Sequence, residues 1–313
     1  MQKCVVIYNP NSGKLSNRND IKKIYKILEN YGYETEIIYT EYKGHAKEIT
    51  KKLKDVDLLL CAGGDGTLNE VISGNIERKN KILLGHLPLG SVNDVAHMYG
   101  MNGNTLSNIA MLLNGTKKNI DVCLINENPF VYIACMGAYV DISYATPRKL
   151  KEKYGKLAYI IYGIQQLKQN LQFYNVKYEI NGEVHEKRFS FIFITNSSRV
   201  GGVNNIYEDV KLNDNKFEVL MCDIKNKWDI IKAVYNLKRK EMNEIKNFTY
   251  FKTDKIKLEF DEVPPSWCID GDELTHDKKV FEITINKDND MMLPTKNIDK
   301  LFEEEKIETI SEN

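Results

Sequence analysis

The sequence has no net charge, since it contains 44 Lys and Arg residues and 44 Asp and Glu residues. A general nucleic-acid binder is normally basic, so we expect no nucleic-acid partner, and any anion that the protein binds must be held by local contacts. Long hydrophobic runs are absent as well, because no segment approaches the roughly 20 apolar residues that span a bilayer. We therefore predict a globular protein without a membrane-spanning helix.

Spacings typical of disulfides and of Cys or His metal sites are also missing. The six cysteines have no C-x-x-C spacing and mostly lie within apolar runs, which predicts buried, reduced thiols. The five histidines show no ligand spacing either. The N-terminus enters an apolar run at residues 4–8 without the layout of a signal peptide, so we expect a cytoplasmic protein.

Two common phosphate-binding motifs do not occur. A Walker loop needs G-x-x-x-x-G-K-[ST], and no segment matches it. The dinucleotide motif G-x-G-x-x-G fails because Asn69 stands where a third glycine should follow Gly64 and Gly66. These absences argue against a P-loop NTPase and against an ordinary Rossmann dehydrogenase.

The chain does contain two regions of different character, and its 313 residues suffice for about two domains. Residues 1–125 alternate apolar strand signals with helix signals, which predicts a parallel sheet covered by helices on both faces. Residues 126–290 contain several short strands and tight turns, including an N-G hairpin at 181–182, as is typical of an antiparallel sandwich. We expect residues 291–313 to pack back on the first domain and to end in an acidic tail.

The strongest functional signal is the glycine loop G-G-D-G-T-L-N-E at residues 63–70, which follows an apolar run. Its glycines let backbone amides approach a ligand, and Thr67-x-x-Glu70 is a capping-box pattern that predicts a helix N-terminus there. Such a junction attracts anions. Asp65 would repel phosphate unless Mg²⁺ bridges the two. The alternative is a tight strand-to-helix turn with Asp65 as a capping residue.

Two further loops of small residues follow or precede predicted elements of the same region. N-P-N-S-G occupies residues 9–13, after the first strand, and P-L-G-S-V-N-D occupies residues 88–94, before a helix. In an open parallel sheet the loops at the carboxyl ends of the strands share one crevice, where ligands bind. We therefore expect the three loops to form one site.

Together these loops resemble the motifs of the diacylglycerol kinase catalytic fold, and more closely those of soluble bacterial lipid kinases, which are similar to sphingosine and NAD kinases. The likeness continues in N-I-D at 119–121, G-K-L-A-Y at 155–159, the glycine pair 201–202 and D-G-D at 270–272, and spans roughly residues 3 to 290. It implies an NAD kinase-like parallel α/β domain, a C-terminal antiparallel β-sandwich domain and a cleft between them.

The activity implied by the resemblance is transfer of the γ-phosphate of ATP to the hydroxyl of diacylglycerol or a related lipid alcohol at the membrane surface. It further implies a structural Mg²⁺ held by Asp214 and the backbone carbonyls of Lys211 and Lys216, with Asp121 in the linked acid network. The nucleotide-binding residues that it implies are Asn9, Pro10, Asn11, Ser12, Gly13, Thr40, Gly64, Asp65, Gly66, Thr67, Leu68, Asn69, Glu70 and Ser91.

The expected catalytic acids are Asp65, Asp270 and Asp272. Asp65 would hold Mg²⁺ at the phosphates, and a carboxylate of D-G-D would accept the proton of the lipid hydroxyl. The family's usual proton acceptor is the Glu of D-G-E, which is Asp272 here, followed by Glu273. In an extended run Asp270 and Asp272 share one face and Glu273 lies on the other, so we favour Asp272, with Asp270 or Glu273 as alternatives. D-G is also a common turn dipeptide, so a purely structural hairpin is a competing interpretation.

Alternatives to a lipid kinase are an NAD kinase-like enzyme and a non-catalytic nucleotide-binding regulator. N-P-x-S-G and the late D-G-D argue against the first, whereas the altered D-G-E allows the second. A basic cluster at residues 148–156 precedes an apolar stretch, which predicts weak, reversible association with anionic membranes, or else a buried helix with a solvated basic end. The resemblance also suggests a homodimer.

Overall fold

The structure is a computed structural model, and it describes residues 1–12, 18–137, 172–180, 182–200, 203–204, 209–225, 229, 245, 247–296 and 298–303. Several predicted features lie outside these residues: Gly13, the basic cluster at 148–156, the G-K-L-A-Y segment and the glycine pair 201–202. The sequence also predicts two helical stretches in the C-terminal half, at residues 150–173 and 228–240, and nearly all of both lies outside the described residues.

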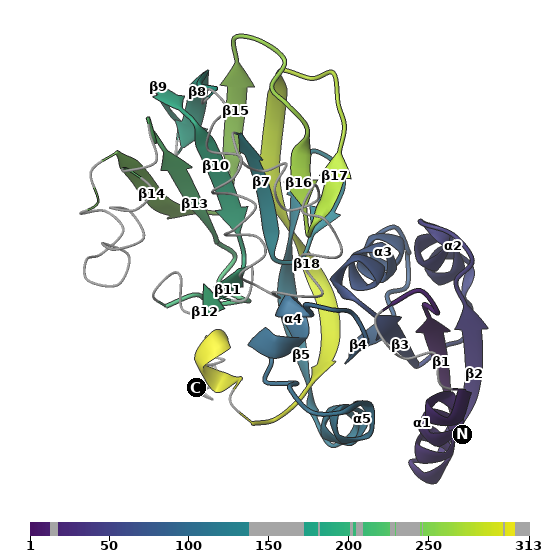
Figure 1. Cartoon of the computed structure of the whole chain (residues 1–313). Coiled ribbons are helices and arrows are strands. Elements are labelled where there is room, and N and C mark those ends of the chain that lie inside the picture. The colour runs from purple at the N-terminus through teal and green to yellow at the C-terminus, as the bar shows by residue number, and fades with distance from the viewer. Residues whose placement is uncertain are drawn as a thin grey trace, which may run out of the picture.

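The N-terminal half is a parallel sheet with helices on both faces, as predicted. Its strands lie in the order β2-β1-β3-β4, all parallel. Helices α2 and α3 pack together on one side of the sheet, and α1 and α5 pack on the other (Figure 1). The elements, in chain order, are β1 (Gln2–Tyr8), α1 (Arg18–Asn30), β2 (Tyr33–Tyr39), α2 (His45–Lys52), β3 (Leu58–Gly63), α3 (Asp65–Ile76), β4 (Leu83–Pro88), α4 (Asp94–Met98) and α5 (Thr105–Leu113).

Burial explains why the strand signals of this half are continuous apolar runs. Every residue of β3 is buried, and so are the last five residues of β1. A strand covered by helices on both faces has no solvated side, so its sequence does not alternate. The outer strand β2 alternates more, and its exposed positions include Glu34 and Glu36.

The C-terminal half is built from two sheets. The second sheet is antiparallel in its main body, with the order β14-β13-β10-β7-β16-β17. The remaining strands are β5 (Thr116–Ile125), β6 (Asn128–Phe130), β7 (Ile133–Gly137), β8 (Tyr174–Ile180), β9 (Glu183–Phe189), β10 (Phe191–Thr195), β11 (Arg199–Val200), β12 (Val203–Asn204), β13 (Phe217–Cys222), β14 (Phe248–Thr253), β15 (Ile256–Phe260), β16 (Trp267–Ile269), β17 (Asp272–Leu274) and β18 (Val280–Leu293).

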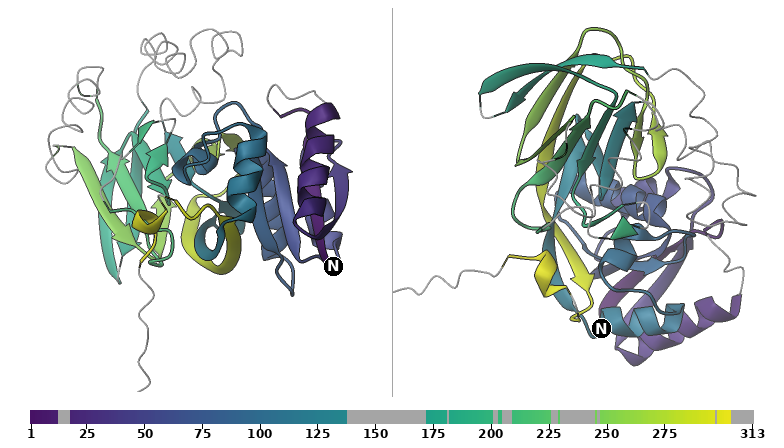
Figure 2. Two further views of the ribbon diagram at one scale, coloured as in Figure 1. Left: turned by 90° about the horizontal axis from the view of Figure 1, so that it is seen from below. Right: turned by 60° about the vertical axis from the view of Figure 1, so that its left-hand side comes forward.

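A single hydrophobic core fills the space between these sheets. It joins Trp267 of β16 to Phe281 of β18, whose ring centroids lie 5.4 Å apart. The N-G turn connects β8 and β9 as predicted, with Ile180 opposite Glu183 and Gly182 at φ +81°. Figure 2 shows the two sheets of this half stacked face to face. The predicted antiparallel sandwich is therefore confirmed.

Strand β18 continues the first sheet from one half of the molecule into the other (Figure 1). It pairs with β15 at Ile283 and with β4 at Met291, while β5 runs antiparallel along most of its length. A register shift between Asn286 and Asn289 interrupts the pairing with β5, and such bulges bend a strand. The two halves are thus joined by a continuous sheet rather than by a linker.

One expectation from composition agrees with the structure. All six cysteines are buried free thiols. Within the described part of the chain, none of the helices combines the length and the apolarity needed to cross a bilayer.

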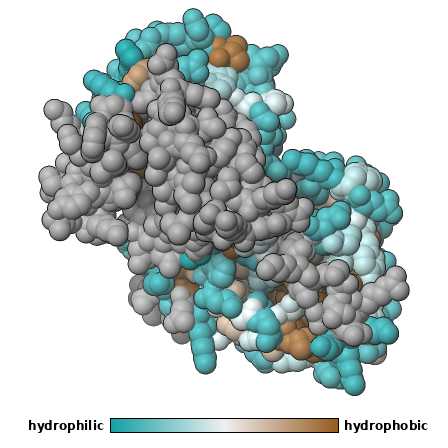
Figure 3. Space-filling model, in the orientation of Figure 1, coloured by the Kyte–Doolittle hydropathy of each residue, from teal (hydrophilic) through white to brown (hydrophobic). Residues whose placement is uncertain are grey.

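The described part of the face seen in Figure 3 carries mainly hydrophilic side chains. The end of the described chain contains one 3₁₀ turn, η2 (Asp299–Leu301).

Candidate active site

A cavity of about 380 Å³ lies where the loops after β1, β2 and β3 meet the β16–β17 hairpin. The glycine loop, the N-P-N-S-G loop and the D-G-D segment, which are far apart in the sequence, therefore share one site. Its lining residues are Asn9, Asn11, Ser12, Thr40, Tyr42, Lys43, Gly64, Gly66, Thr67, Glu70 and Asp272.

Helix α3 starts at this cavity, but not in the way that the sequence pattern predicts. The helix begins at Asp65 with Gly64 as its N-cap, three residues before the predicted start at Leu68. The capping box is not formed, because the Thr67 hydroxyl accepts a hydrogen bond from Asn9 Nδ2 at 2.9 Å. The glycine N-cap leaves the first turn of the helix open toward the cavity, and the dipole of α3 favours an anion there.

The glycines of this loop serve two purposes. A Cβ atom on Gly64 would lie 3.2 Å from the Cα of Gly90, so the glycine loop and the loop after β4 approach each other closely. A Cβ atom on Gly66 would meet only the Asp272 carboxylate, at 3.7 Å. Gly64 therefore allows the two loops to pack closely, whereas Gly66 keeps space open between α3 and the hairpin of the C-terminal half.

The N-P-N-S-G loop is hydrogen-bonded to the glycine loop. The Asn9 amide donates to the Ala62 carbonyl at 3.0 Å, and the Asn9 side-chain oxygen accepts from the Asn11 amide at 2.9 Å. The Ser12 hydroxyl accepts from the Gly64 amide at 3.3 Å. The two predicted phosphate-binding loops thus form one wall of the cavity.

Glu70 stabilises the opposite wall rather than its own helix. Its two carboxylate oxygens accept hydrogen bonds from the amides of Gly44 at 2.8 Å and Ala46 at 3.2 Å, at the start of α2. These amides have no partner within a helix, so the carboxylate satisfies them. Glu70 thereby holds the β2–α2 loop, which carries Tyr42 and Lys43 into the cavity.

Asp65 caps helix α4. Its carboxylate accepts hydrogen bonds from the amides of Asp94 at 2.9 Å and Val95 at 3.4 Å. Burial raises the pKa of Asp65 to about 7, and the two N–H donors oppose that rise. The alternative interpretation of Asp65 as a capping residue therefore describes the contacts of this carboxylate. The helix that it caps is α4, however, and not α3, to which Asp65 belongs. Its role in binding Mg²⁺ stays a prediction.

Asp270 is buried and belongs to a turn, so the expectation that Asp270 and Asp272 share one face of an extended run is wrong. Asp270 and Gly271 have φ values of 49° and 92°, the two positive values of a type I′ hairpin turn. The Asp270 carboxylate accepts four N–H hydrogen bonds, from the amides of Val131, Tyr132 and Ile133 and from the Asn69 side chain. Burial raises the pKa of Asp270, and these donors oppose the rise. Its oxygens are occupied in holding the hairpin against β7 and α3.

Asp272 is the only one of the cavity-lining residues named above that comes from the C-terminal half. It is the first residue of β17, its side chain is 58% exposed, and one of its oxygens lies 3.2 Å from Lys43 Nζ. Glu273 pairs with Cys268 in the hairpin and does not belong to the lining. Among the candidate bases, Asp272 is thus the carboxylate that lines the cavity.

Other predicted residues lie beside the cavity. The Leu68 side chain is fully buried in the core, and its amide is bonded to the Gly64 carbonyl. Asn69 donates to Asp270 at 2.8 Å and to the Pro129 carbonyl at 2.9 Å, so it joins α3 to the hairpin. Pro10 and Ser91 are exposed and do not line the cavity.

Sequence reasoning missed Tyr42 and Lys43, which line the cavity two and three residues after Thr40. A signal for them exists in the chain. They follow the strand predicted at residues 34–39, and a loop at the carboxyl end of a parallel strand faces the shared crevice. Thr40 itself is buried, and its amide donates to the Tyr8 carbonyl at 2.9 Å.

Two buried acids, Asp121 and Glu218, and the half-buried Asp214 lie at the predicted metal site, away from this cavity. Burial raises the pKa of Asp121 to about 6 and that of Glu218 to about 7, and it also raises the pKa of Asp214. The Asp121 carboxylate accepts the Asn215 amide at 2.7 Å, and the Asp214 carboxylate accepts the Lys216 amide at 3.0 Å. One Glu218 oxygen has no hydrogen-bond partner among the described residues. The candidate metal ligands at this site are all oxygen atoms, the ligand type that Mg²⁺ prefers.

No group of three or more Asp, Glu, His or Cys side chains with metal-binding geometry occurs within the described ranges. A Mg²⁺ ion commonly takes one or two carboxylates and keeps several waters, so a site built on Asp214 and backbone carbonyls does not require such a group. The residues present therefore fit the predicted ion chemically.

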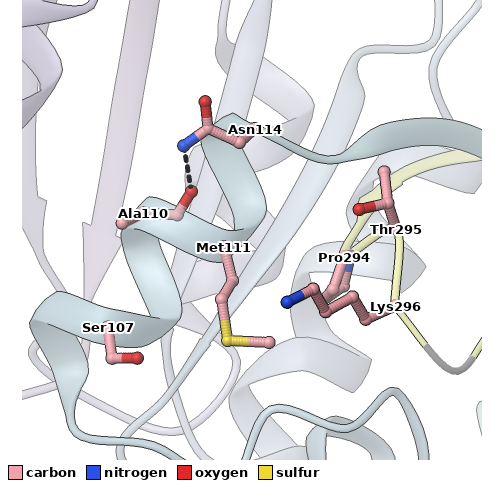
Figure 4. Close-up of a pocket in the computed structure, with 7 residues that line it drawn as sticks. All are labelled: Ser107, Ala110, Met111, Asn114, Pro294, Thr295 and Lys296. Atoms are coloured by element: carbon pink, nitrogen blue, oxygen red, sulfur yellow. Dashed lines mark hydrogen bonds between the residues drawn. The ribbon is translucent and has the colours of Figure 1, made fainter.

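A second cavity, of about 390 Å³, lies between α5 and the segment after β18. Figure 4 shows its lining, in which the Asn114 side chain donates to the Ala110 carbonyl at 2.8 Å. Lys296 is its only charged lining residue among those that the structure describes, and none of the predicted motifs reaches it.

Comparison with known proteins identifies the family. The diacylglycerol kinase catalytic domain model matches residues 3–125. A diacylglycerol kinase of Bacillus subtilis is 30% identical over 265 residues, which cover 84% of this chain and 87% of that protein. A diacylglycerol kinase of Staphylococcus aureus is 31% identical over 223 residues, which cover 71% of this chain and 70% of that protein.

The fold agrees with this relationship. A crystal structure of a diacylglycerol kinase from Bacillus anthracis matches with a TM-score of 0.75 at 22% identity, covering 93% of this chain and 97% of that one. The chain belongs to the diacylglycerol kinase family. It is accordingly an enzyme of the ATP-dependent lipid kinase class.

Proposed function

We propose that this enzyme phosphorylates the hydroxyl of diacylglycerol or a closely related lipid alcohol, with Asp272 as the proton acceptor. The observation that carries the proposal is the meeting of Asp272 with the open first turn of α3, where only 3.7 Å separates its carboxylate from the position of a Cβ on Gly66. The relatives named above, which match most of this chain, support diacylglycerol as the substrate.

Phosphoryl transfer depends mainly on alignment and on neutralisation of charge. We place the phosphates of ATP at the N-terminus of α3, where the helix dipole and the glycine backbone favour an anion. The acceptor hydroxyl then lies between the γ-phosphate and Asp272. As its oxygen bonds to phosphorus, the bond from phosphorus to ADP breaks, and the hydroxyl proton passes to the Asp272 carboxylate.

A Mg²⁺ ion is part of the proposal. Asp214, with the backbone carbonyls of Lys211 and Lys216, would hold the structural ion, which supplies positive charge beside the buried Asp121 and Glu218. The proposed role of Asp65 at a second ion competes with its two bonds to α4. We therefore assign Asp65 primarily to positioning the loop before α4, and secondarily to the metal.

We further propose a cytoplasmic enzyme that associates reversibly with anionic membranes and forms a homodimer. The support for membrane association is the basic cluster at residues 148–156, next to an apolar stretch in the sequence. Each basic residue near an anionic surface contributes roughly 1 kcal/mol, and salt screens the attraction. Vesicle sedimentation tests the idea, since equal binding to neutral and anionic lipid would contradict it.

The substrate is tested with labelled ATP and a panel of acceptors: diacylglycerol, sphingosine, undecaprenol and NAD, each presented with Mg²⁺. We expect label in diacylglycerol, or in another lipid alcohol, and none in NAD. Transfer of label to NAD alone would favour an NAD kinase-like activity and contradict the proposal. Binding of ATP without transfer to any acceptor would favour a non-catalytic regulator.

A further inference from the structure

Lys43 is a cation of the nucleotide cavity to which none of the sequence motifs assigns a role. Its ammonium lies 3.2 Å from Asp272 across the cavity, and the other charged lining residues in the described part of the chain, Glu70 and Asp272, are acidic. Glu70 is already bonded to the amides of Gly44 and Ala46. A cavity suited to a polyphosphate thus contains one described cation, and that cation is paired with the proposed base.

The backbone on either side of Lys43 is held firmly in place. The rings of Tyr42 and His45 stack with centroids 4.5 Å apart, and the Tyr42 hydroxyl donates to Glu48 at 3.1 Å. Gly44 adopts φ +91° and donates its amide to Glu70. The loop therefore presents Lys43 to the cavity from a fixed position, while its long side chain keeps freedom to change partner.

The pair between Lys43 and Asp272 is easy to exchange. The two side chains are 72% and 58% exposed, and ion pairs so accessible to water are weak. A triphosphate carries more negative charge than one carboxylate and offers several acceptor oxygens, so a lysine ammonium prefers it. When a nucleotide occupies the cavity, Lys43 has a stronger partner than Asp272.

We infer that Lys43 is a positioning residue that leaves Asp272 for the phosphate oxygens of the bound nucleotide, and so frees the Asp272 carboxylate to accept the proton of the acceptor hydroxyl. The inference rests on the proposed function, because it assumes the same nucleotide site and the same base. It deepens that function by coupling the availability of the base to the presence of the phosphate donor.

The test measures nucleotide binding by calorimetry, without lipid, for wild type, Lys43→Met, Lys43→Gln and Lys43→Arg. We expect both neutral variants to weaken ATP binding by about 10-fold or more, the scale of one charge-assisted hydrogen bond, and to leave adenosine binding unchanged. Lys43→Arg should restore most of the affinity. The matched control is Lys47→Met, since Lys47 pairs with Glu77 at 2.7 Å and does not line the cavity.

A double-mutant cycle with Asp272→Asn tests the exchange itself. If Lys43 divides its time between Asp272 and phosphate, Asp272→Asn should tighten ATP binding in the presence of Lys43, and the gain should shrink when Lys43 is Met. Additive effects would overturn the exchange. Equal loss of ATP and adenosine binding in both neutral variants would show a merely structural role, and unchanged ATP binding would remove Lys43 from the phosphate site.

These outcomes are separable from failure of the proposed function. If the wild type binds ATP with the expected dependence on Lys43 but labels no lipid, the substrate proposal fails and the phosphate contact stands. If the wild type labels lipid while Lys43→Met binds ATP normally, the inference on Lys43 fails and the proposed function stands. A wild type that binds no ATP overturns both.

Discussion

The substitution Asp270→Ala distinguishes the structural role of this acid from the proposed catalytic role of Asp272, two residues away. It removes the acceptor of four N–H hydrogen bonds, three from the backbone of residues 131–133 and one from Asn69. Asp270 is 7% exposed, so water does not replace the lost acceptor freely. The variant leaves buried donors unpaired at the contact of the hairpin with β7 and α3.

The expected cost follows from these contacts. A buried donor without a partner costs about 1–3 kcal/mol, so the three buried backbone donors alone give a loss of at least about 3 kcal/mol in the free energy of unfolding. Since folded domains are stable by only about 5–15 kcal/mol, this is a large share. The midpoint temperature of thermal unfolding should fall by on the order of 10 °C. Asp270→Asn keeps one acceptor oxygen and tolerates φ 49°, so it should lose less.

The assay is urea and thermal unfolding of Asp270→Ala, Asp270→Asn and Asp272→Ala beside wild type. Asp272 is exposed, and its removal should change the free energy of unfolding by no more than about 0.5 kcal/mol. A stable but inactive Asp270→Ala protein would refute the reasoning, because the hydrogen-bond network would then be dispensable and the role of Asp270 would be chemical.

Further predictions concern the glycine loop and pH. Gly66→Ala should fold normally but weaken ATP binding as measured by calorimetry, because its methyl group projects toward Asp272. Gly63→Ala should destabilise the fold as measured by thermal melts, since its Cβ would lie 2.5 Å from the Thr67 Cβ. Because burial raises the pKa of Asp65 to about 7, the folded state holds the carboxyl proton more tightly than the unfolded chain does. The resulting stabilisation of up to about 4 kcal/mol is fully present below about pH 4 and is lost as the pH rises through about 7. Asp65→Asn should flatten that part of the stability profile, and an unchanged slope would contradict the assignment.

The parts of the fold that the sequence predicts correctly depend on local patterns. The apolar run at residues 56–61 overlaps β3, and the N-G dipeptide marks the turn between β8 and β9. Each of these signals lies within a few neighbouring residues, so no knowledge of distant contacts is needed. The parallel sheet and the antiparallel sandwich follow from the order of such signals.

The errors at the candidate site arise where distant residues decide a local pattern. Thr67 and Glu70 match a capping box, yet Glu70 accepts hydrogen bonds from an amide 26 residues away. Asp65 likewise caps a helix 29 residues farther along the chain. Competition between near and distant donors cannot be read from spacing, because it depends on how closely α2, α3 and α4 pack.

The position of Lys43 depends on the arrangement of the two halves. The strand signal at residues 34–39 places Lys43 in a loop at the shared crevice, but nothing local indicates that it pairs with Asp272. Its partner Asp272 reaches it only because the β16–β17 hairpin lies over the start of α3, where Asn69 and Asp270 hold it. Pairing across a cleft between distant elements therefore requires the folded structure.

The most direct test of the central claim is the initial rate of phosphate transfer from labelled ATP to diacylglycerol, at saturating ATP, by wild type, Asp272→Asn, Asp272→Glu and Glu273→Gln. The wild type should transfer label, Asp272→Asn should lose about 10²-fold or more, and Asp272→Glu should retain activity. Glu273→Gln should remain close to wild type, because Glu273 lies outside the cavity lining. An inactive Glu273→Gln beside an active Asp272→Asn would contradict the assignment of the base.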